Sequence, residues 1–318
     1  MLFSTIQTSR RRAGLVVITA ALLSATLFAP SAAQACACGC GIFDVGTGAM
    51  FPDGAGGTVF VEADWVDQNR NWSGTTAAAA DQNADKRVQS QFYTAGLQYL
   101  FNRTWGLQVD VPYWRRQFTT QDDDGNIATF DHTAVGDLRI RGVYTGFSSD
   151  LSSGLTFGLK LPTGDASYAH FDADTEIGSG STDLLLGAFH RGRLTAEGKV
   201  GYFVRGQWQE PLQSKANYRP GNELIGVVGV YYQGWAHADT LAITPILQMT
   251  AAYRGHDGGP DGHPEDSGYT RLLVSPGIEI HMSKIRIYAE AGFALHDNVS
   301  GNQLVSRRNY KLSMFYSF

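Results

Sequence analysis

The stretch that decides the fold closes the chain and reads Asn309-Tyr310-Lys311-Leu312-Ser313-Met314-Phe315-Tyr316-Ser317-Phe318. Apolar side chains occupy every second position, at Tyr310, Leu312, Met314, Tyr316 and Phe318. Polar residues occupy the positions between them, with Phe315 as the exception. Successive side chains of a β-strand point to opposite faces, so this period of two predicts a strand with one apolar face.

The same alternation recurs upstream and predicts about twelve strands. They cover about 57–67, 89–101, 104–116, 132–146, 153–162, 180–190, 194–206, 222–234, 240–254, 268–281, 285–296 and 304–318. Many are about 10–13 residues long, whereas strands of soluble sheets are typically about 5–6. Pro112, Pro245 and Pro276 fall inside three of them, where they would mark bulges or strand ends.

Two further features distinguish a membrane barrel from a soluble sandwich. Aromatic residues gather at strand ends, as in the interfacial girdles of membrane barrels, and short turns alternate with long loops, expected at about 68–88, 117–131, 163–179, 207–221, 255–267 and 297–303. We therefore expect an all-β fold, namely a transmembrane antiparallel up-and-down β-barrel of about 12 strands over residues 57–318. An even number of strands would place both ends in the periplasm and the long loops outside.

Residues 1–35 have the layout of a secretory signal peptide. Arg10, Arg11 and Arg12 are followed by an apolar stretch from Ala13 to about Phe28 and by the small-residue site Ala33-Gln34-Ala35. This stretch is shorter than the roughly 18 residues that a spanning helix requires. A signal peptide and a terminal aromatic strand together indicate the outer membrane of a Gram-negative cell, with membrane lipid as a partner.

The composition excludes other classes of protein. The net charge is −5, and loss of the three leader arginines would make it −8, which disfavours a nucleic-acid partner. The chain has 37 Gly, 14 Tyr and 17 Phe, which fits β-structure with many turns.

The polar face of the expected barrel carries charges of both signs. The predicted lumen-lining residues are Glu62, Asp64, Asp110, Arg139, Arg141, Lys160, Glu197, Lys199, Arg205, Arg271, Glu279, Arg286, Glu290 and Lys311. Unpaired charges in a narrow lumen are costly, so we expect opposite signs to pair across strands. Such a network would either fill the lumen structurally or select small-molecule solutes.

All three cysteines of the chain lie in a Cys/Gly-rich segment at residues 36–56. Cys36, Cys38 and Cys40 could bind Cu or Zn through their thiolates, and no other cofactor is expected. Lipidation of Cys36, a disulfide that leaves one thiol free, or no role are the alternatives. The segment could also plug the lumen or dock a periplasmic partner, such as a metalloprotein or an electron carrier.

Three motifs lie in the middle of the chain. They are Val135-Gly136-Asp137-Leu138, Gly158-Leu159-Lys160-Leu161-Pro162-Thr163-Gly164-Asp165 and Ile177-Gly178-Ser179-Gly180-Ser181-Thr182-Asp183. Pro and Gly end strands, and Asp137 and Asp183 are placed to accept hydrogen bonds from loop amides. Their order and spacing resemble the outer-membrane "MetA-pathway of phenol degradation" family of transporters, over about 135–190. The resemblance implies an outer-membrane barrel that passes small, often apolar or aromatic molecules.

An outer-membrane hydrolase is the weaker alternative. His281-Met282-Ser283 has the His–Ser spacing of outer-membrane phospholipases, but it falls at an expected periplasmic turn. Asp131–His132 and His296–Asp297 are Asp–His neighbours at the level that outer-membrane proteases use. The acidic loops 122–126 and 256–266 offer oxygen ligands for a divalent cation, although solvated loops are the simpler interpretation. We expect a channel or transporter, not an enzyme, and no catalytic residue.

Overall fold

The computed structural model describes residues 55–122, 124–215, 217–233, 235–237 and 241–318. The expected signal peptide at 1–35 lies outside the described residues. So do Cys36, Cys38, Cys40 and all but the last two residues of the Cys/Gly-rich segment 36–56. Their roles therefore stay predictions.

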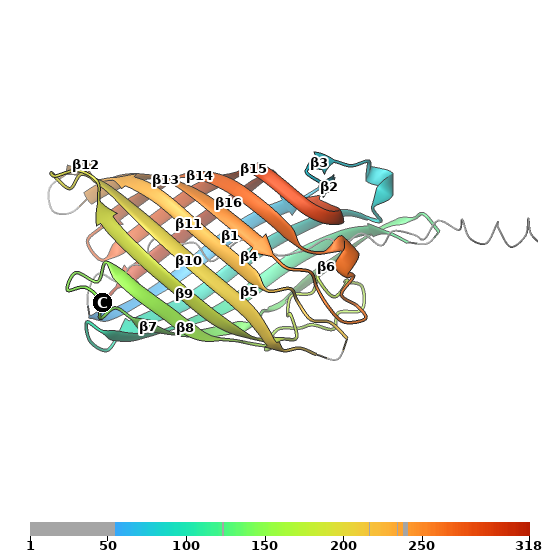
Figure 1. Cartoon of the computed structure of the whole chain (residues 1–318), viewed down its shortest axis with the longest axis horizontal. Coiled ribbons are helices and arrows are strands. Elements are labelled where there is room, and N and C mark those ends of the chain that lie inside the picture. Colours follow the sequence, from blue (N-terminus) through green and yellow to red (C-terminus); the bar gives the residue numbers. More distant parts are fainter. Residues whose placement is uncertain (1–54, 123, 216, 234, 238–240) are drawn as a thin grey trace, which may run out of the picture. The chain divides into compact units, whose positions relative to one another are not determined.

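The described residues form a closed antiparallel barrel of twelve strands (Figure 1). The strands are β1 (Gly56–Gln68), β4 (Asp85–Leu100), β5 (Trp105–Gln121), β7 (Leu138–Tyr144), β8 (Ser153–Leu161), β9 (Thr182–Arg193), β10 (Val200–Gln213), β11 (Glu223–Tyr232), β13 (Leu241–Arg254), β14 (Tyr269–Met282), β15 (Ile285–Val305) and β16 (Arg308–Ser317). Each pairs with its neighbours in chain order, and β1 pairs with both β4 and β16, which closes the barrel. The predicted fold is confirmed.

Several smaller elements lie at the two ends of this barrel. β6 (Ile127–Val135) pairs with the second half of β5, and β7 pairs with its first half. β6 and β7 together therefore occupy one strand position of the barrel. β2 (Arg70–Gly74) pairs with the end of β15, and β3 (Thr76–Ala77) with β2. β12 (Trp235–His237) pairs with β13, and two short 3₁₀ helices cover Ala80–Gln82 and Pro264–Asp266. Among the described residues, no helix has the length and apolarity to cross a bilayer.

Several strands extend beyond the predicted bounds at the end opposite the C-terminus. The expected loop 117–131 is a hairpin of β5 and β6, and the expected loop 297–303 belongs to β15. Those segments alternate weakly because their outer face meets water above the membrane, where no apolar outer face is needed. Pro112 and Pro245 do lie inside β5 and β13, and Pro276 inside β14, without ending them.

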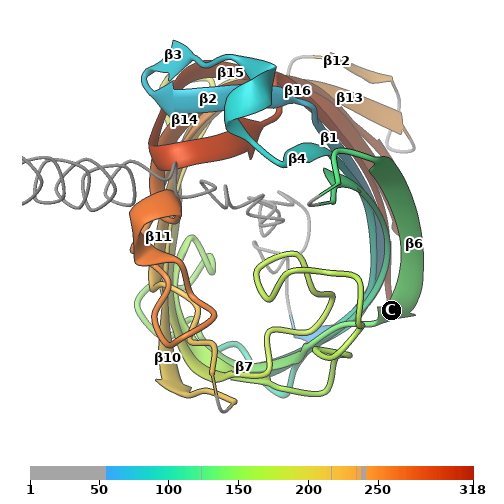
Figure 2. The ribbon, with the colours of Figure 1, turned by 90° about the vertical axis from the view of Figure 1, so that its right-hand side faces the viewer.

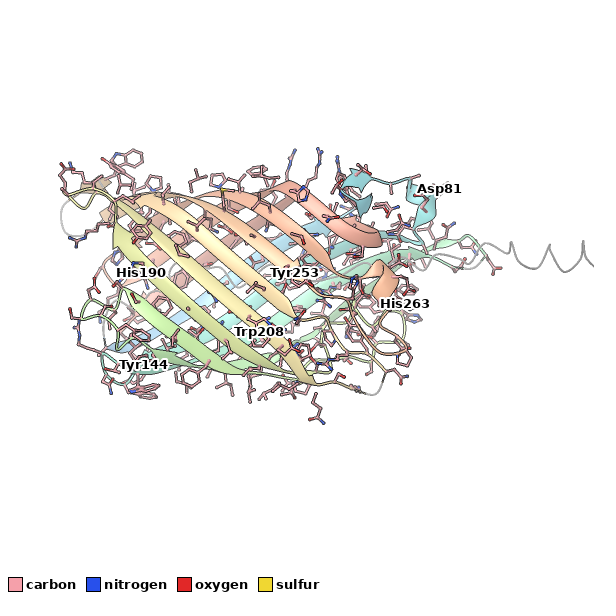
Figure 3. All side chains as sticks on the ribbon, viewed as in Figure 1. Asp81, Tyr144, His190, Trp208, Tyr253 and His263 are labelled. Carbon is pink, nitrogen blue, oxygen red and sulfur yellow. The ribbon has the colours of Figure 1, made fainter. Side chains whose placement is uncertain are left out.

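The outer face of the barrel carries a belt of exposed apolar side chains between two aromatic girdles. Tyr99, Trp105 and Phe318 are exposed near the C-terminal end, and Tyr113 and Tyr310 near the other. Figure 3 labels Tyr144 near the first end, and Trp208 and Tyr253 further along. Beyond the second girdle the outer surface carries the exposed ion pairs Arg87–Asp67 and Arg115–Asp131. This distribution marks the face that spans the membrane.

The inner face is packed as well as polar. Phe315, which breaks the alternation of the last strand, points inward and is fully buried. Its ring lies 5.8 Å from that of Phe60, and the Arg286 guanidinium lies 5.6 Å from its centroid. The exception in the sequence is therefore a packing residue of the lumen, which places an aromatic ring beneath a buried cation.

The connection between β8 and β9, residues 162–181, folds into the barrel instead of away from it. Figure 2 looks along the barrel and shows this yellow-green segment inside the ring of strands, beside β7. It contains no strand, and it connects two of the motifs that the sequence singles out. An inward loop narrows the lumen, so its contacts decide what the lumen can admit.

Candidate functional site: the lumen cavity

A cavity of about 170 Å³ lies inside the barrel. Side chains of most strands line it, together with residues 173–179 of the inward connection. Phe60, Phe92, Trp114 and Phe189 give it aromatic walls. Its charged residues are Arg116, Arg139, Arg141, Lys160, Arg205 and Arg254 and, against them, Glu62, Asp110, Asp137, Asp174, Glu176 and Glu223. Because the two signs balance, the cavity has no formal charge that would exclude either cations or anions.

One polar network crosses a side of the lumen from β5 to β10. Arg141 is buried, donates to the carboxylate of Asp110 and also donates to Gln207 Oε1 over 3.2 Å. Arg205 donates to the same Gln207 oxygen over 2.8 Å. β8 and β9 separate β7 from β10 in the barrel wall. The Arg141–Gln207 hydrogen bond therefore spans the lumen side of these two strands and narrows the lumen there.

A second network centres on Lys160 of β8. Its ammonium lies 2.6 Å from the Asp183 carboxylate and 3.7 Å from that of Asp137, and it donates to Ser179 Oγ over 2.6 Å. Asp183 also accepts from Ser181 Oγ and from Gln209 Nε2. All three motifs that carry the family resemblance thus meet at one buried lysine, although more than forty residues separate Asp137 from Asp183 in the sequence.

Asp137 closes the neck of the inward connection. Its carboxylate accepts from the Gly164 amide over 3.0 Å, from the Ser179 amide over 2.8 Å and from Ser179 Oγ over 2.5 Å. Gly164 and Gly178 touch there: a Cβ on Gly178 would lie 2.3 Å from the Gly164 carbonyl carbon. Only glycine fits so close an approach. The residues between, 165–177, form a compact loop with joined ends, which we call the lobe.

The lobe is held against the wall at points beyond its neck. Arg116 of β5, only 1 % exposed, donates to the carbonyl oxygens of Thr175 and Glu176. Its guanidinium lies 5.5 Å from the Trp114 ring centroid. His132 Nε2 lies 3.0 Å from an Asp165 carboxylate oxygen. Rings also pack there: those of His132 and Tyr168 stack at 4.1 Å, those of Phe130 and His170 stack at 4.4 Å, and Phe118 meets Phe171 edge-on at 5.7 Å.

Glu176 of the lobe lines the cavity, and the hydrogen bonds to its carboxyl do not fully compensate for its burial. Its Oε2 is buried and accepts no hydrogen bond from the described residues. Burial raises the pKa of Glu176 to about 7, and the Asp165 carboxylate contributes to the increase. Arg116 and Lys215 act in the opposite direction on the pKa but do not cancel the effect of burial. A half-buried carboxyl of this kind is a candidate for titration near neutral pH.

A third network centres on Lys311 of β16, on the other side of the lumen. Its ammonium lies 3.4 Å from Asp64 and 3.8 Å from Glu62, both on β1. Nearby, Glu290 accepts from Gln248 Nε2 over 2.6 Å and from the Tyr288 hydroxyl over 2.5 Å. These bonds connect neighbouring walls of the barrel and do not involve the lobe.

Most of the predicted lumen-lining residues lie on the inner face of the barrel. Glu62, Asp110, Arg139, Arg141, Lys160 and Arg205 line the cavity itself. Asp64, Arg271, Glu279, Arg286, Glu290 and Lys311 lie on inward positions of β1, β14, β15 and β16 outside the cavity lining. Arg271 donates to Asp297 over 2.6 Å, so this pair also joins two strands.

Glu197 and Lys199 are exceptions, and their predicted place in a strand is wrong. Both are exposed in the turn between β9 and β10, because β10 begins at Val200. The alternation Leu194, Ala196 and Val200 resembles a strand, but Gly198 has a φ of +70°, which turns the chain there.

Two important residues lie outside the predicted set. Arg116 lies an even number of positions after Asp110 on β5, so extending the alternation beyond Tyr113 would have placed it in the lumen. Glu176 lies in a loop without periodicity, and no local pattern marks a loop that folds inward. Only the three flanking motifs hinted that this connection has a fixed structure.

The rival sites are not assembled in the described structure. His132 contacts Asp165 at 3.0 Å, whereas Asp131 pairs with Arg115 on the outer surface. Asp297 is bonded to Arg271, and His281 shares a hydrogen bond with the backbone oxygen of Ser283. Across the part of the chain that the structure describes, no group of three His, Cys, Asp or Glu side chains is arranged to hold a metal ion, the acidic loops included.

A closed twelve-strand barrel with an apolar outer belt and a polar lumen defines the class: this chain is a multi-pass β-barrel of the outer membrane. The comparisons with known proteins agree on the fold. The chain is similar to the COG4313 outer membrane channel from Pseudomonas putida F1, with 14% identity, a TM-score of 0.64, and coverage of 86% of this chain and 100% of that one. It is also similar to the β-domain of the Bordetella autotransporter BrkA, with 11% identity, a TM-score of 0.51, and coverage of 83% and 100%. Neither a family model nor a curated protein sequence matches it.

Proposed function

We propose that this protein is a channel for small molecules, and that its cargo is about the size of one aromatic ring. The observation that carries the proposal is the lumen cavity with its mixed lining. A cavity of about 150 Å³ is enough to hold a benzene molecule, and this one measures about 170 Å³. The aromatic walls formed by Phe60, Phe92, Trp114 and Phe189 suit an apolar body.

The charged lining argues for a cargo that also carries a polar group. An apolar solute without one would have to cross a lumen in which charges of both signs are hydrated or paired, and it would gain little from them. A small aromatic compound with a hydroxyl or a similar group can meet Arg139 or Glu62 while its ring contacts Phe92 or Phe189.

The resemblance of the three motifs to the "MetA-pathway of phenol degradation" family supports the same cargo. These motifs build the neck and the Lys160 network, so they shape the constriction. We extend the proposal to that type of transporter on this basis. A catalytic function is not part of the proposal.

The test is transport through the purified barrel in lipid bilayers. We expect single-channel conductance, and an entry of phenol into proteoliposomes that exceeds its entry into protein-free liposomes by more than the corresponding excess for glucose. Glucose carries hydroxyl groups around its ring and has no aromatic ring to pack on the aromatic walls, and the protein-free liposomes account for the phenol that crosses the lipid by itself. Phe189→Ala should lessen the preference for phenol. A matched control is Phe157→Ala, which removes an aromatic ring from the outer, lipid-facing surface. Absence of both conductance and any solute entry beyond that into protein-free liposomes would refute the channel.

A further inference from the structure

We propose that the lobe, residues 165–177, is a gate of this lumen, that Arg116 is its latch, and that ionisation of Glu176 releases it. This inference rests on the proposed channel function and adds regulation to it. Its basis is the separation of the lobe's attachments into two groups: one joins the neck to β7, and the other joins the lobe itself to β5 and β6.

The neck forms a fixed pivot. Asp137 binds both sides of it through the amides of Gly164 and Ser179, and the Gly178 amide donates to the Asp165 carbonyl over 2.6 Å. Thr163 Oγ1 accepts from the Leu138 amide over 2.9 Å and donates to the Gly136 carbonyl over 3.1 Å. These bonds tie the neck to the start of β7 wherever the rest of the lobe lies.

The lobe beyond the neck is held differently, by side chains of β5 and β6: Arg116 binds its C-terminal end, and His132 pairs with Asp165 at its N-terminal end. Arg116 reaches the carbonyl oxygens of Thr175 and Glu176 and donates through Nε to Ser90 Oγ over 3.0 Å. Because the acceptors of these two bonds are backbone carbonyl oxygens, the bonds depend on the position of residues 175–176. The stacked rings at His132 and Phe130 add apolar contact, which resists displacement without fixing one geometry.

Glu176 couples this latch to its surroundings. Its carboxyl lines the cavity with a buried Oε2, and the groups that face it are Asp165 in the lobe, Arg116 on β5 and Lys215 in the β10–β11 connection. Asp165 is itself paired with His132 of β6. Ionising Glu176 therefore adds a second carboxylate beside Asp165 at a site that excludes water from one oxygen.

The direction of the pH effect follows from linkage. Burial raises the pKa of Glu176 from 4.5 to about 7, so the docked lobe prefers the protonated carboxyl. A displaced lobe would expose Glu176 to water and return its pKa toward 4.5. Docking is therefore strongest below about pH 4.5, weakens as the pH rises through about 7, and then stays constant. The half-exposed carboxyl is screened by solvent, so we expect an effect of about tenfold on the docking equilibrium.

The experiment measures the open probability of single channels of the full chain in planar bilayers between pH 4 and pH 8. For the wild type we expect the open probability to rise about tenfold over this range. Glu176→Gln should remain at the low-pH level throughout. The control Glu265→Gln, which changes an exposed carboxyl in the second 3₁₀ helix, should behave as the wild type. Arg116→Gln should open the channel at every pH, and Arg116→Lys should restore part of the closure.

Hydrogen exchange gives a second readout that does not depend on conductance. At pH 8, amides of residues 165–177 should exchange faster in the wild type than in Glu176→Gln, while the strand amides of the barrel remain equal. A wild-type channel that conducts with the same open probability at all pH values, with equal lobe exchange in both proteins, would overturn the gate and leave the channel proposal intact. Failure of every variant to conduct would instead reject the channel.

Discussion

Two buried lysines on opposite sides of the lumen have nearly the same charge environment but different structural roles. Lys160 lies between Asp137 and Asp183, and Lys311 between Asp64 and Glu62. Both lysines are 5 % exposed. Lys311 connects two adjacent strands, β1 and β16, where the barrel closes. Lys160 connects strands to the neck of the lobe.

The carboxylates around the two lysines also differ in their other donors. Asp137 accepts three further hydrogen bonds from the neck, and Asp183 accepts from Ser181 and Gln209. Glu62 accepts from Ser313 over the longer distance of 3.3 Å. Hydrogen bonds from neutral donors stabilise a buried carboxylate even without a cation. The comparison indicates that the charge of the lysine matters more at the barrel seam than at the neck.

The largest expected effect is therefore that of Lys311→Met. It removes the ammonium that lies beside Asp64 and Glu62 in a buried site, and breaking a buried pair costs about 3–5 kcal/mol. We expect its unfolding free energy, measured by urea denaturation in detergent, to fall by that amount. Lys160→Met should lower it by clearly less, because donors remain at both carboxylates, but it should increase single-channel conductance by loosening the neck.

Equal destabilisation by both substitutions would contradict the comparison, since it would mean that the neutral donors around Asp137 and Asp183 do not compensate for a lost ammonium. Unchanged conductance in Lys160→Met, together with a folded barrel by circular dichroism, would show that Lys160 does not control the neck. The Lys311→Met protein serves as the conductance control for loss of a lumen cation away from the lobe.

A smaller effect is expected at the neck itself. Gly178→Ala would place a Cβ 2.3 Å from the Gly164 carbonyl carbon, so the two ends of the lobe must separate. Overpacking of this kind typically costs about 1–3 kcal/mol. We expect faster hydrogen exchange within residues 165–177 and little change in the strands. Gly206→Ala on β10, where a Cβ meets no atom within 4 Å, is the matched control and should leave exchange unaltered. Equal exchange in the two variants would argue against a tight neck.

The sequence is sufficient to predict the barrel because lipid imposes a simple pattern on its strands. Wherever the outer face meets lipid, as at Leu312 and Met314, every second residue is apolar and the period is legible. The pattern loses its meaning above the girdle, where Thr129 of β6 faces water, so it does not predict the extension of β5 and β6. The pattern also predicts a strand wrongly at residues 194–199, because Leu194 and Ala196 of this turn happen to alternate with polar residues.

The candidate site is predictable only in part, since it depends on a loop. Alternation is enough to place a strand residue such as Lys160 on the polar face, because strand geometry alone decides that. The lobe depends on contacts between distant segments: Asp137 with Gly164, and Arg116 with Thr175. No local period encodes such contacts, so the motifs indicate turn chemistry without showing that it holds a loop inside the lumen.

The smallest expected effect is that of breaking the exposed Arg87–Asp67 ion pair, which has good hydrogen-bond geometry but is not buried. Arg87 donates to Asp67 through Nε over 2.8 Å and through Nη2 over 2.7 Å, a better geometry than either contact of Lys311. The two side chains are 44% and 37% exposed on the outer surface, however, so water stabilises both charges when the pair is broken. We expect Arg87→Gln to change the unfolding free energy by less than about 1 kcal/mol, and high salt to remove the difference. A loss as large as that of Lys311→Met would mean that hydrogen-bond geometry, and not exclusion of water, sets the value of an ion pair in this barrel.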